Sequence, residues 1–243
     1  MEIIRKIGIT FLVLIFQQIN NQLPLSSKNF KFRFLTLTLF SYFFVCFPLA
    51  QIYFKDSFFL QNHWPLIFFI VTLTCLFLTG RLNSLQLGLS NTNSWNIRLG
   101  LLVGIIPILA VVTLDLLLLK TGFAENNLFS GAELRESPKF SILSLFLNGI
   151  ISPAINQIFI TGYMLNILTK RNDLAISANG IIYATMSFNW GIGYLGLGMI
   201  SAALLRFSGS LIPTIFFAIG CSTAKLLILT FYPRIITLLV FLV

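Results

Sequence analysis

The feature that most constrains this chain is a succession of long apolar runs separated by short gaps. A helix needs about 20 apolar residues, within a range of about 17–25, to cross the hydrocarbon core of a bilayer. Most of the runs approach or exceed this length, and the gaps leave no room for a soluble domain. The sequence therefore predicts an all-α membrane protein, a polytopic transmembrane helical bundle of about seven or eight hydrophobic segments. The clearest candidates are residues 34–54, 64–80, 99–119, 140–168, 174–190, 192–205 and 211–231.

Composition supports the same class of protein. Hydrophobic residues make up 57% of the 243 residues and charged residues only 9%, whereas a soluble domain carries about 25% charged residues. The net charge of +9 would suit nucleic-acid binding, but the sixteen Lys and Arg residues stand singly or in pairs at the ends of apolar runs. Basic residues in such places meet anionic lipid headgroups. We expect the lipid bilayer as partner, no nucleic acid, and a multi-pass location in a bacterial inner membrane or a thylakoid.

One segment, residues 152–171, carries the most specific pattern. It reads SPAINQIFITGYMLNILTKR and places two amides, Asn156 and Gln157, near the start of an otherwise apolar helix that Pro153 opens. It resembles the signature helix of the CAAX prenyl protease and bacteriocin-processing (CPBP) family of intramembrane proteases, approximately Pro-x-x-Glu-Glu-x-x-x-Arg-Gly. In this register the amides occupy the two Glu positions, and Thr161, which precedes Gly162, occupies the Arg position.

Two further patches are similar to the same family. The run from Tyr183 fits the pattern Phe-x-x-x-His, with Ser187 at the His position. The run 208–213 keeps the frame Gly-Ser-Leu-x-Pro, and after it Ala218 and Ser222 stand where the family has His and Asn. The resemblance covers roughly residues 140–225, with a weaker echo at 85–100. Together with the apolar runs and the basic residues, it divides the chain into three parts. These are 1–33, an N-terminal interfacial or marginal membrane segment with a basic loop; 34–139, N-terminal transmembrane helices; and 140–243, CPBP-like core helices.

The resemblance implies peptide hydrolysis inside a membrane, which the residues at these positions do not support. Hydrolysis needs a base that takes a proton from water and donors that stabilise the oxyanion. Amides have no usable proton equilibrium, and the methyl group of Ala218 cannot donate a hydrogen bond. Losing one such group typically slows a reaction by about 10²–10⁴. We therefore expect no catalytic residues among the family positions, which hold Asn156, Gln157, Thr161, Ser187, Ala218 and Ser222.

The distribution of acids and histidine leads to the same expectation without any alignment. The single histidine, His63, lies in a predicted loop, and the four glutamates lie in the N-terminal tail or in one loop. The three cysteines are far apart, without metal-ligand spacing. The sequence therefore predicts no metal site and no cofactor.

The remaining polar residues of the apolar segments form the candidate site. Asn156, Gln157, Ser187, Asn189 and Ser222 could line a polar cavity that binds a peptide carbonyl without cleaving it. The alternative is interhelical hydrogen bonding worth about 0.6 kcal/mol per bond. Both interpretations stay open.

Two charged residues fall inside predicted spans. Asp115 is a possible functional acid, and Lys225 could neutralise it across the bundle or extend to the headgroups.

Glycine patterns invite one other interpretation. The run Gly191-Ile-Gly193-Tyr-Leu-Gly196 formally matches a dinucleotide-binding motif, but no strand precedes it. We interpret it as close helix packing, like the pair Gly100 and Gly104.

The leading prediction is a catalytically inactive, CPBP-like membrane protein that binds a hydrophobic peptide, a prenylated tail or another membrane protein. The alternatives are an active CAAX-type intramembrane endopeptidase with a relocated site, a small transporter component, and an assembly protein of a membrane complex.

Overall fold

The computed structural model describes residues 28–55, 57–79, 82, 87–89, 93–121, 142–165 and 174–231. Every regular element in these ranges is a helix, as the sequence predicted. The expectations for the N-terminal segment up to residue 27, for the acidic loop after residue 121 and for the last twelve residues lie outside the described part. The chain divides into two units, Met1–Leu49 and Ala50–Val243, and each is described by itself.

The described part of the first unit is one uninterrupted helical stretch. α2 (Lys28–Phe40) continues into the π-helix η1 (Ser41–Cys46) and then into α3 (Phe47–Tyr53), and the backbone stays right-handed helical at both junctions. The helix begins at Lys28, within the stretch that we expected to be a basic loop; Lys and Arg are good helix formers. The apolar part, Phe34–Tyr53, is long enough to cross a membrane.

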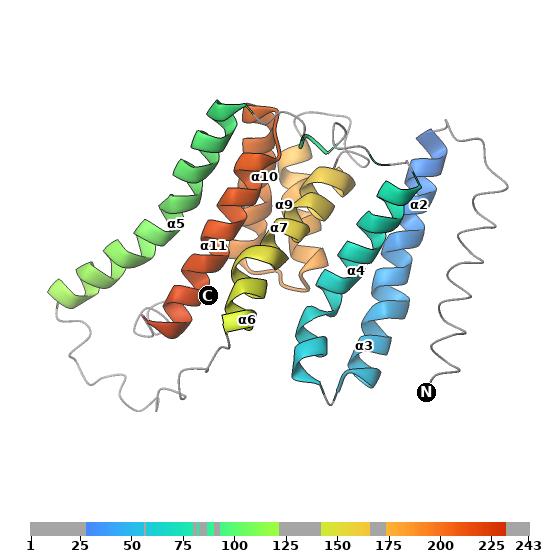
Figure 1. Ribbon diagram of the computed structural model, residues 1–243, viewed down its shortest axis with the longest axis horizontal. Coiled ribbons are helices and arrows are strands. Elements are labelled where there is room, and N and C mark those ends of the chain that lie inside the picture. Colours follow the sequence, from blue (N-terminus) through green and yellow to red (C-terminus); the bar gives the residue numbers. More distant parts are fainter. Residues whose placement is uncertain are drawn as a thin grey trace. The chain divides into compact units, whose positions relative to one another are not determined.

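The second unit contains the other predicted segments, and Figure 1 shows their order. α4 (Phe58–Leu78) and α5 (Ser94–Lys120) come first. One continuous helix then joins α6 (Ile142–Phe146), the π-helix η3 (Leu147–Ile151), α7 (Ser152–Gln157) and the π-helix η4 (Ile158–Met164). The last three are α9 (Leu174–Met186), α10 (Ile192–Ser208) and α11 (Ile212–Thr230).

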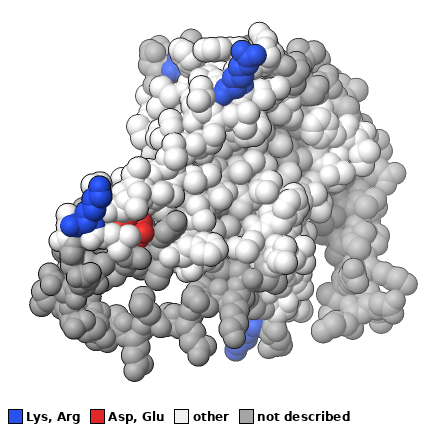
Figure 2. Space-filling model, turned by 60° about the vertical axis from the view of Figure 1, so that its left-hand side comes forward, with Lys and Arg blue, Asp and Glu red and all other residues white. Residues whose placement is uncertain are grey.

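The helices differ in whether they can cross a bilayer alone. Four described helical stretches are long and apolar enough: Phe34–Tyr53, Ser94–Lys120, Ile142–Met164 and Ile212–Thr230. Three apolar stretches are shorter, His63–Leu78, Leu174–Met186 and Ile192–Ser208. The face of the molecule in Figure 2 shows few charged side chains among the described residues, which suits a membrane.

Several predicted boundaries differ from the structure. His63, which was expected in a loop, lies within α4 and is buried. The apolar run 174–190 was expected to be one span, but α9 ends at Met186. Phe188 has φ of 50°, in the left-handed region, and the Asn189 side chain accepts a hydrogen bond from the backbone N–H of Gly191 at 2.9 Å. The turn at Phe188 ends α9, and the Asn189 hydrogen bond holds the backbone just before α10 begins. The apolar run in the sequence gives no sign of this turn, because its hydrophobicity continues through it.

α5 packs along α11 at a glycine contact. A Cβ atom on Gly220 would collide with the backbone of Gly104, and one on Gly100 would lie 2.8 Å from the ring of Phe216. The predicted close packing at Gly100 and Gly104 is therefore confirmed. Beyond this contact the two helices diverge towards their C-terminal ends (Figure 1).

The sequence predicted close helix packing at Gly191, Gly193 and Gly196, but the packed glycines of α10 and its neighbour are different ones. Gly193 and Gly196 have open space where a Cβ would stand, with no described atom within 4 Å. α9 and α10 meet instead at Gly180 and Gly198, where a Cβ on Gly198 would lie 2.6 Å from the backbone oxygen of Asn179. A glycine spacing indicates where helices can approach, but the neighbouring helix decides which glycines it contacts.

Candidate functional site

The signature segment forms the second half of the continuous helix Ile142–Met164. Pro153 stands at the first turn of α7, and the seven residues of η4 follow directly. Every residue from Phe159 to Leu165 is buried. Stretches of π-helix often occur at functional sites, because the wider turn changes the direction in which side chains point. This stretch brings Gln157 and Thr161 into the interior of the second unit.

A fully buried network of neutral polar side chains surrounds these two residues. The Thr161 hydroxyl donates to the Gln157 side-chain oxygen at 2.7 Å, and the Gln157 side-chain nitrogen donates to the Ser201 hydroxyl at 3.0 Å. The Asn179 side-chain nitrogen donates to the Thr161 hydroxyl at 3.1 Å and to the Gly198 carbonyl at 2.7 Å. All four side chains are 0% exposed. The network therefore joins α7 and η4 to α9 and α10.

Tyr183 extends this polar cluster towards α11. Its hydroxyl lies near the side chains of Asn156, Gln157 and Cys221. The Tyr183 ring also packs against Tyr194, with centroids 6.5 Å apart. The polar side chains of α7 thus face both α9 and α11.

The other predicted cavity residues lie in two different places, Ser222 on α11 and Ser187 with Asn189 in the turn after α9. Ser222 donates to the backbone oxygen of Asn148, in η3, at 2.7 Å. Ala218 is buried on the same helix as Ser222. Ser187 lies in the turn after α9, and the exposed Asn189 caps the N-H of Gly191. The structure thus groups Asn156, Gln157 and Thr161, while Ser187 and Asn189 occupy the turn between α9 and α10.

Sequence reasoning missed three members of the cluster: Asn179, Ser201 and the hydroxyl of Tyr183. A signal for Asn179 was present, since it is an amide in the middle of an apolar helix beside Gly180, where an unpaired amide would be costly. Ser201 carried no such signal, because a serine in an apolar helix can bond to its own backbone.

The two charged residues of the predicted spans lie on helices that pack together. Asp115, on α5, is 5% exposed. Lys225, on α11, is exposed, and its amine donates to the Tyr194 hydroxyl at 3.4 Å and lies 5.9 Å from the centre of that ring. The ion pair between Asp115 and Lys225 stays a prediction.

The cluster at Gln157 can hold neutral hydrogen-bonding groups in fixed positions. Its members are amides and hydroxyls, and their donors bond to one another. Within the part of the chain that the structure describes, the Asn179 side-chain oxygen is a buried acceptor without a hydrogen-bond partner. In the same part, no group of three or more His, Cys, Asp and Glu side chains could hold a metal ion.

Comparison with known proteins identifies one match. Residues 138–224 match the family model described as type II CAAX prenyl endopeptidase Rce1-like. The matched segment runs from just before α6 into α11 and contains the six family positions as well as Asn179 and Ser201. No curated protein sequence matches the chain. No solved structure matches it either.

Proposed function

We propose that the protein is a membrane-embedded member of the Rce1-like CAAX prenyl endopeptidase family, whose model matches residues 138–224, and that it binds but does not cleave. The ligand would be a hydrophobic peptide, a prenylated tail or another membrane protein. The family match and the apolar helices support the coarser statement, a membrane protein like the CPBP-type proteases.

The observation that carries the proposal is that the Gln157 amide is buried and already hydrogen-bonded within the protein. It stands where the family has a carboxylate, it is 0% exposed, and both ends of its amide group bond to protein side chains. A general base must accept a proton from water that it contacts. An amide that is buried and already bonded at its oxygen and nitrogen meets neither condition.

The energetics of the network support a structural role for it. A buried polar group is stable only when it is hydrogen-bonded, and a satisfied network makes the packing around it specific. Thr161 and Ser201 bond to the two ends of the Gln157 amide, and Asn179 bonds to Thr161 in turn. The family's helical framework can therefore persist in this chain without the family's charged groups.

A cleavage and binding assay tests the proposal. The purified protein in lipid nanodiscs is incubated with a farnesylated CAAX peptide and, separately, with a transmembrane peptide, and products are followed by mass spectrometry. We expect both peptides to stay intact and the farnesylated one to bind saturably in fluorescence anisotropy, more tightly than its unprenylated form. The matched variant is Asn156→Ala, since the half-buried Asn156 lies outside the Gln157–Thr161–Asn179–Ser201 bonds. Hydrolysis that Asn156→Ala abolishes would show that the protein is an active protease.

A further inference from the structure

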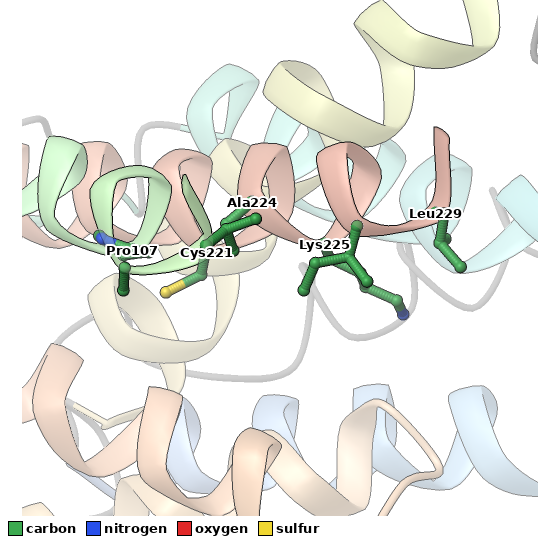
Figure 3. A pocket seen from close by; sticks show the side chains of 8 residues that line it. Pro107, Cys221, Ala224, Lys225 and Leu229 are labelled. Atoms are coloured by element: carbon green, nitrogen blue, oxygen red, sulfur yellow. The ribbon is translucent and has the colours of Figure 1, made fainter. Parts of the chain in front are cut away.

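An apolar groove lies between α5 and α11. Its volume is about 570 Å³, and its walls come from Pro107 and Val111 on α5 and from Cys221, Lys225 and Leu229, among others, on α11. It follows from the packing of the two helices, which touch at Gly104 and Gly220 and then diverge. Figure 3 shows these side chains along one side of α11.

Among the described residues that line this groove, Lys225 is the only charged one. Its amine contacts the hydroxyl and the ring of Tyr194, both of which are neutral. Lys225 thus brings a basic group to an otherwise apolar lining. In Figure 3 the amine extends towards the end of the groove where Leu229 lies.

Lys225 lies near the C-terminal end of α11, a helix long and apolar enough to cross a membrane. It stands five residues before Thr230, where the helix ends, which is about 7.5 Å of helical rise. A lysine at this depth extends its amine to the headgroup level while its methylene chain stays in the apolar region. The apolar wall from Cys221 to Leu229 spans about 12 Å along the same axis.

We propose that this groove binds the acyl chain of an anionic phospholipid, with the Lys225 amine on the lipid's phosphate. An acyl chain needs no hydrogen-bond partners, and the lining offers almost none besides that amine. A peptide in the same groove would leave its backbone amides and carbonyls unsatisfied, at a cost of several kcal/mol per group. The chemistry of the lining therefore favours a lipid over a peptide. This site is separate from the peptide-binding function proposed above and does not depend on it.

The test compares anionic with zwitterionic lipid on delipidated, detergent-purified protein. Binding of phosphatidylglycerol and of phosphatidylcholine with the same acyl chains is measured by native mass spectrometry and by the shift of the thermal unfolding midpoint. We expect phosphatidylglycerol to bind more tightly to the wild type. In Lys225→Gln its affinity should fall about fivefold, since a lysine near an anionic surface contributes about 1 kcal/mol, while binding of phosphatidylcholine stays the same.

Three further variants make the result specific. Lys120→Gln removes an exposed lysine from the last turn of α5, outside the groove, and should leave lipid preference unchanged. Lys225→Arg keeps the charge and should keep the preference, which also shows that the position tolerates substitution. Ala110→Phe fills the groove from an exposed position and should weaken both lipids.

Several results would overturn the proposal. These are equal binding of the two lipids to the wild type, an equal loss in Lys120→Gln and Lys225→Gln, or undiminished binding in Ala110→Phe. If neither lipid binds, but a prenylated peptide with a free carboxylate binds and loses affinity in Lys225→Gln, the groove holds a peptide tail instead.

Discussion

The Thr161 hydroxyl donates a hydrogen bond to the side-chain oxygen of Gln157, one helical turn before it, and neither side chain reaches solvent. The same hydroxyl accepts a hydrogen bond from Asn179 on α9. One small group therefore connects the signature helix to a neighbouring helix.

The first prediction removes this hydroxyl. Thr161→Val keeps the shape of the side chain but breaks both bonds, so we expect the free energy of unfolding to fall by about 1 kcal/mol, since such bonds in membrane proteins average about 0.6 kcal/mol each. The measurement is the thermal unfolding midpoint in detergent. Thr113→Val is the matched control, because the exposed Thr113 bonds only to carbonyls of its own helix. If the two variants unfold at the same temperature, the network contributes nothing to stability.

The second prediction concerns the contact between α5 and α11. Gly220→Ala places a methyl group against the backbone of Gly104, so the helices must separate. We expect a loss of about 1–3 kcal/mol or more, as for other overpacked sites, together with lower yield of folded protein. Fluorescence-detected size-exclusion chromatography after a temperature series measures both effects.

Gly196→Ala provides the control for this glycine. No described atom lies within 4 Å of the new methyl group, and alanine favours a helix over glycine by about 1 kcal/mol. Its stability should equal or exceed that of the wild type. Equal losses in the two variants would mean that helix geometry, and not the α5–α11 contact, limits substitution.

The third prediction concerns an aromatic stack between α4 and the signature helix. The rings of Phe69 and Phe159 lie 4.3 Å apart at an angle of 14°, and both residues are buried. Phe69→Ala should destabilise the protein by roughly 3–5 kcal/mol, because it leaves a cavity. Phe77→Ala, on the same helix at a position 43% exposed, should have little effect on the unfolding midpoint. A loss as large at Phe77 would contradict this assignment of the core.

The fourth prediction tests the ion pair that the sequence suggested. Since the Lys225 amine contacts Tyr194, we expect the effects of Asp115→Asn and Lys225→Gln on expression level and unfolding midpoint to add in the double variant. The charge swap, Asp115→Lys with Lys225→Asp, should not restore the wild-type values. Full restoration by the swap would establish the ion pair and remove the free charge on which lipid binding depends.

The sequence alone was sufficient for the class of fold and for the resemblance to the CPBP family. The length of each apolar run is a local property of the chain, and the thickness of the bilayer relates that length directly to a spanning helix. The spacing of Pro153, Gly162 and the frame 208–213 is also local, and it carries the resemblance. The chemical character of Asn156, Gln157 and Thr161 could also be read from the chain, since an amide cannot act as a general base wherever it is placed.

Only the tertiary structure decided which groups meet. The partners of Gln157 on other helices, the contact of Gly220 with Gly104, the open space at Gly196 and the groove beside Lys225 all depend on how distant helices pack. Packing is decided by shape complementarity between segments far apart in sequence, and neither hydrophobicity nor residue spacing encodes which faces come together.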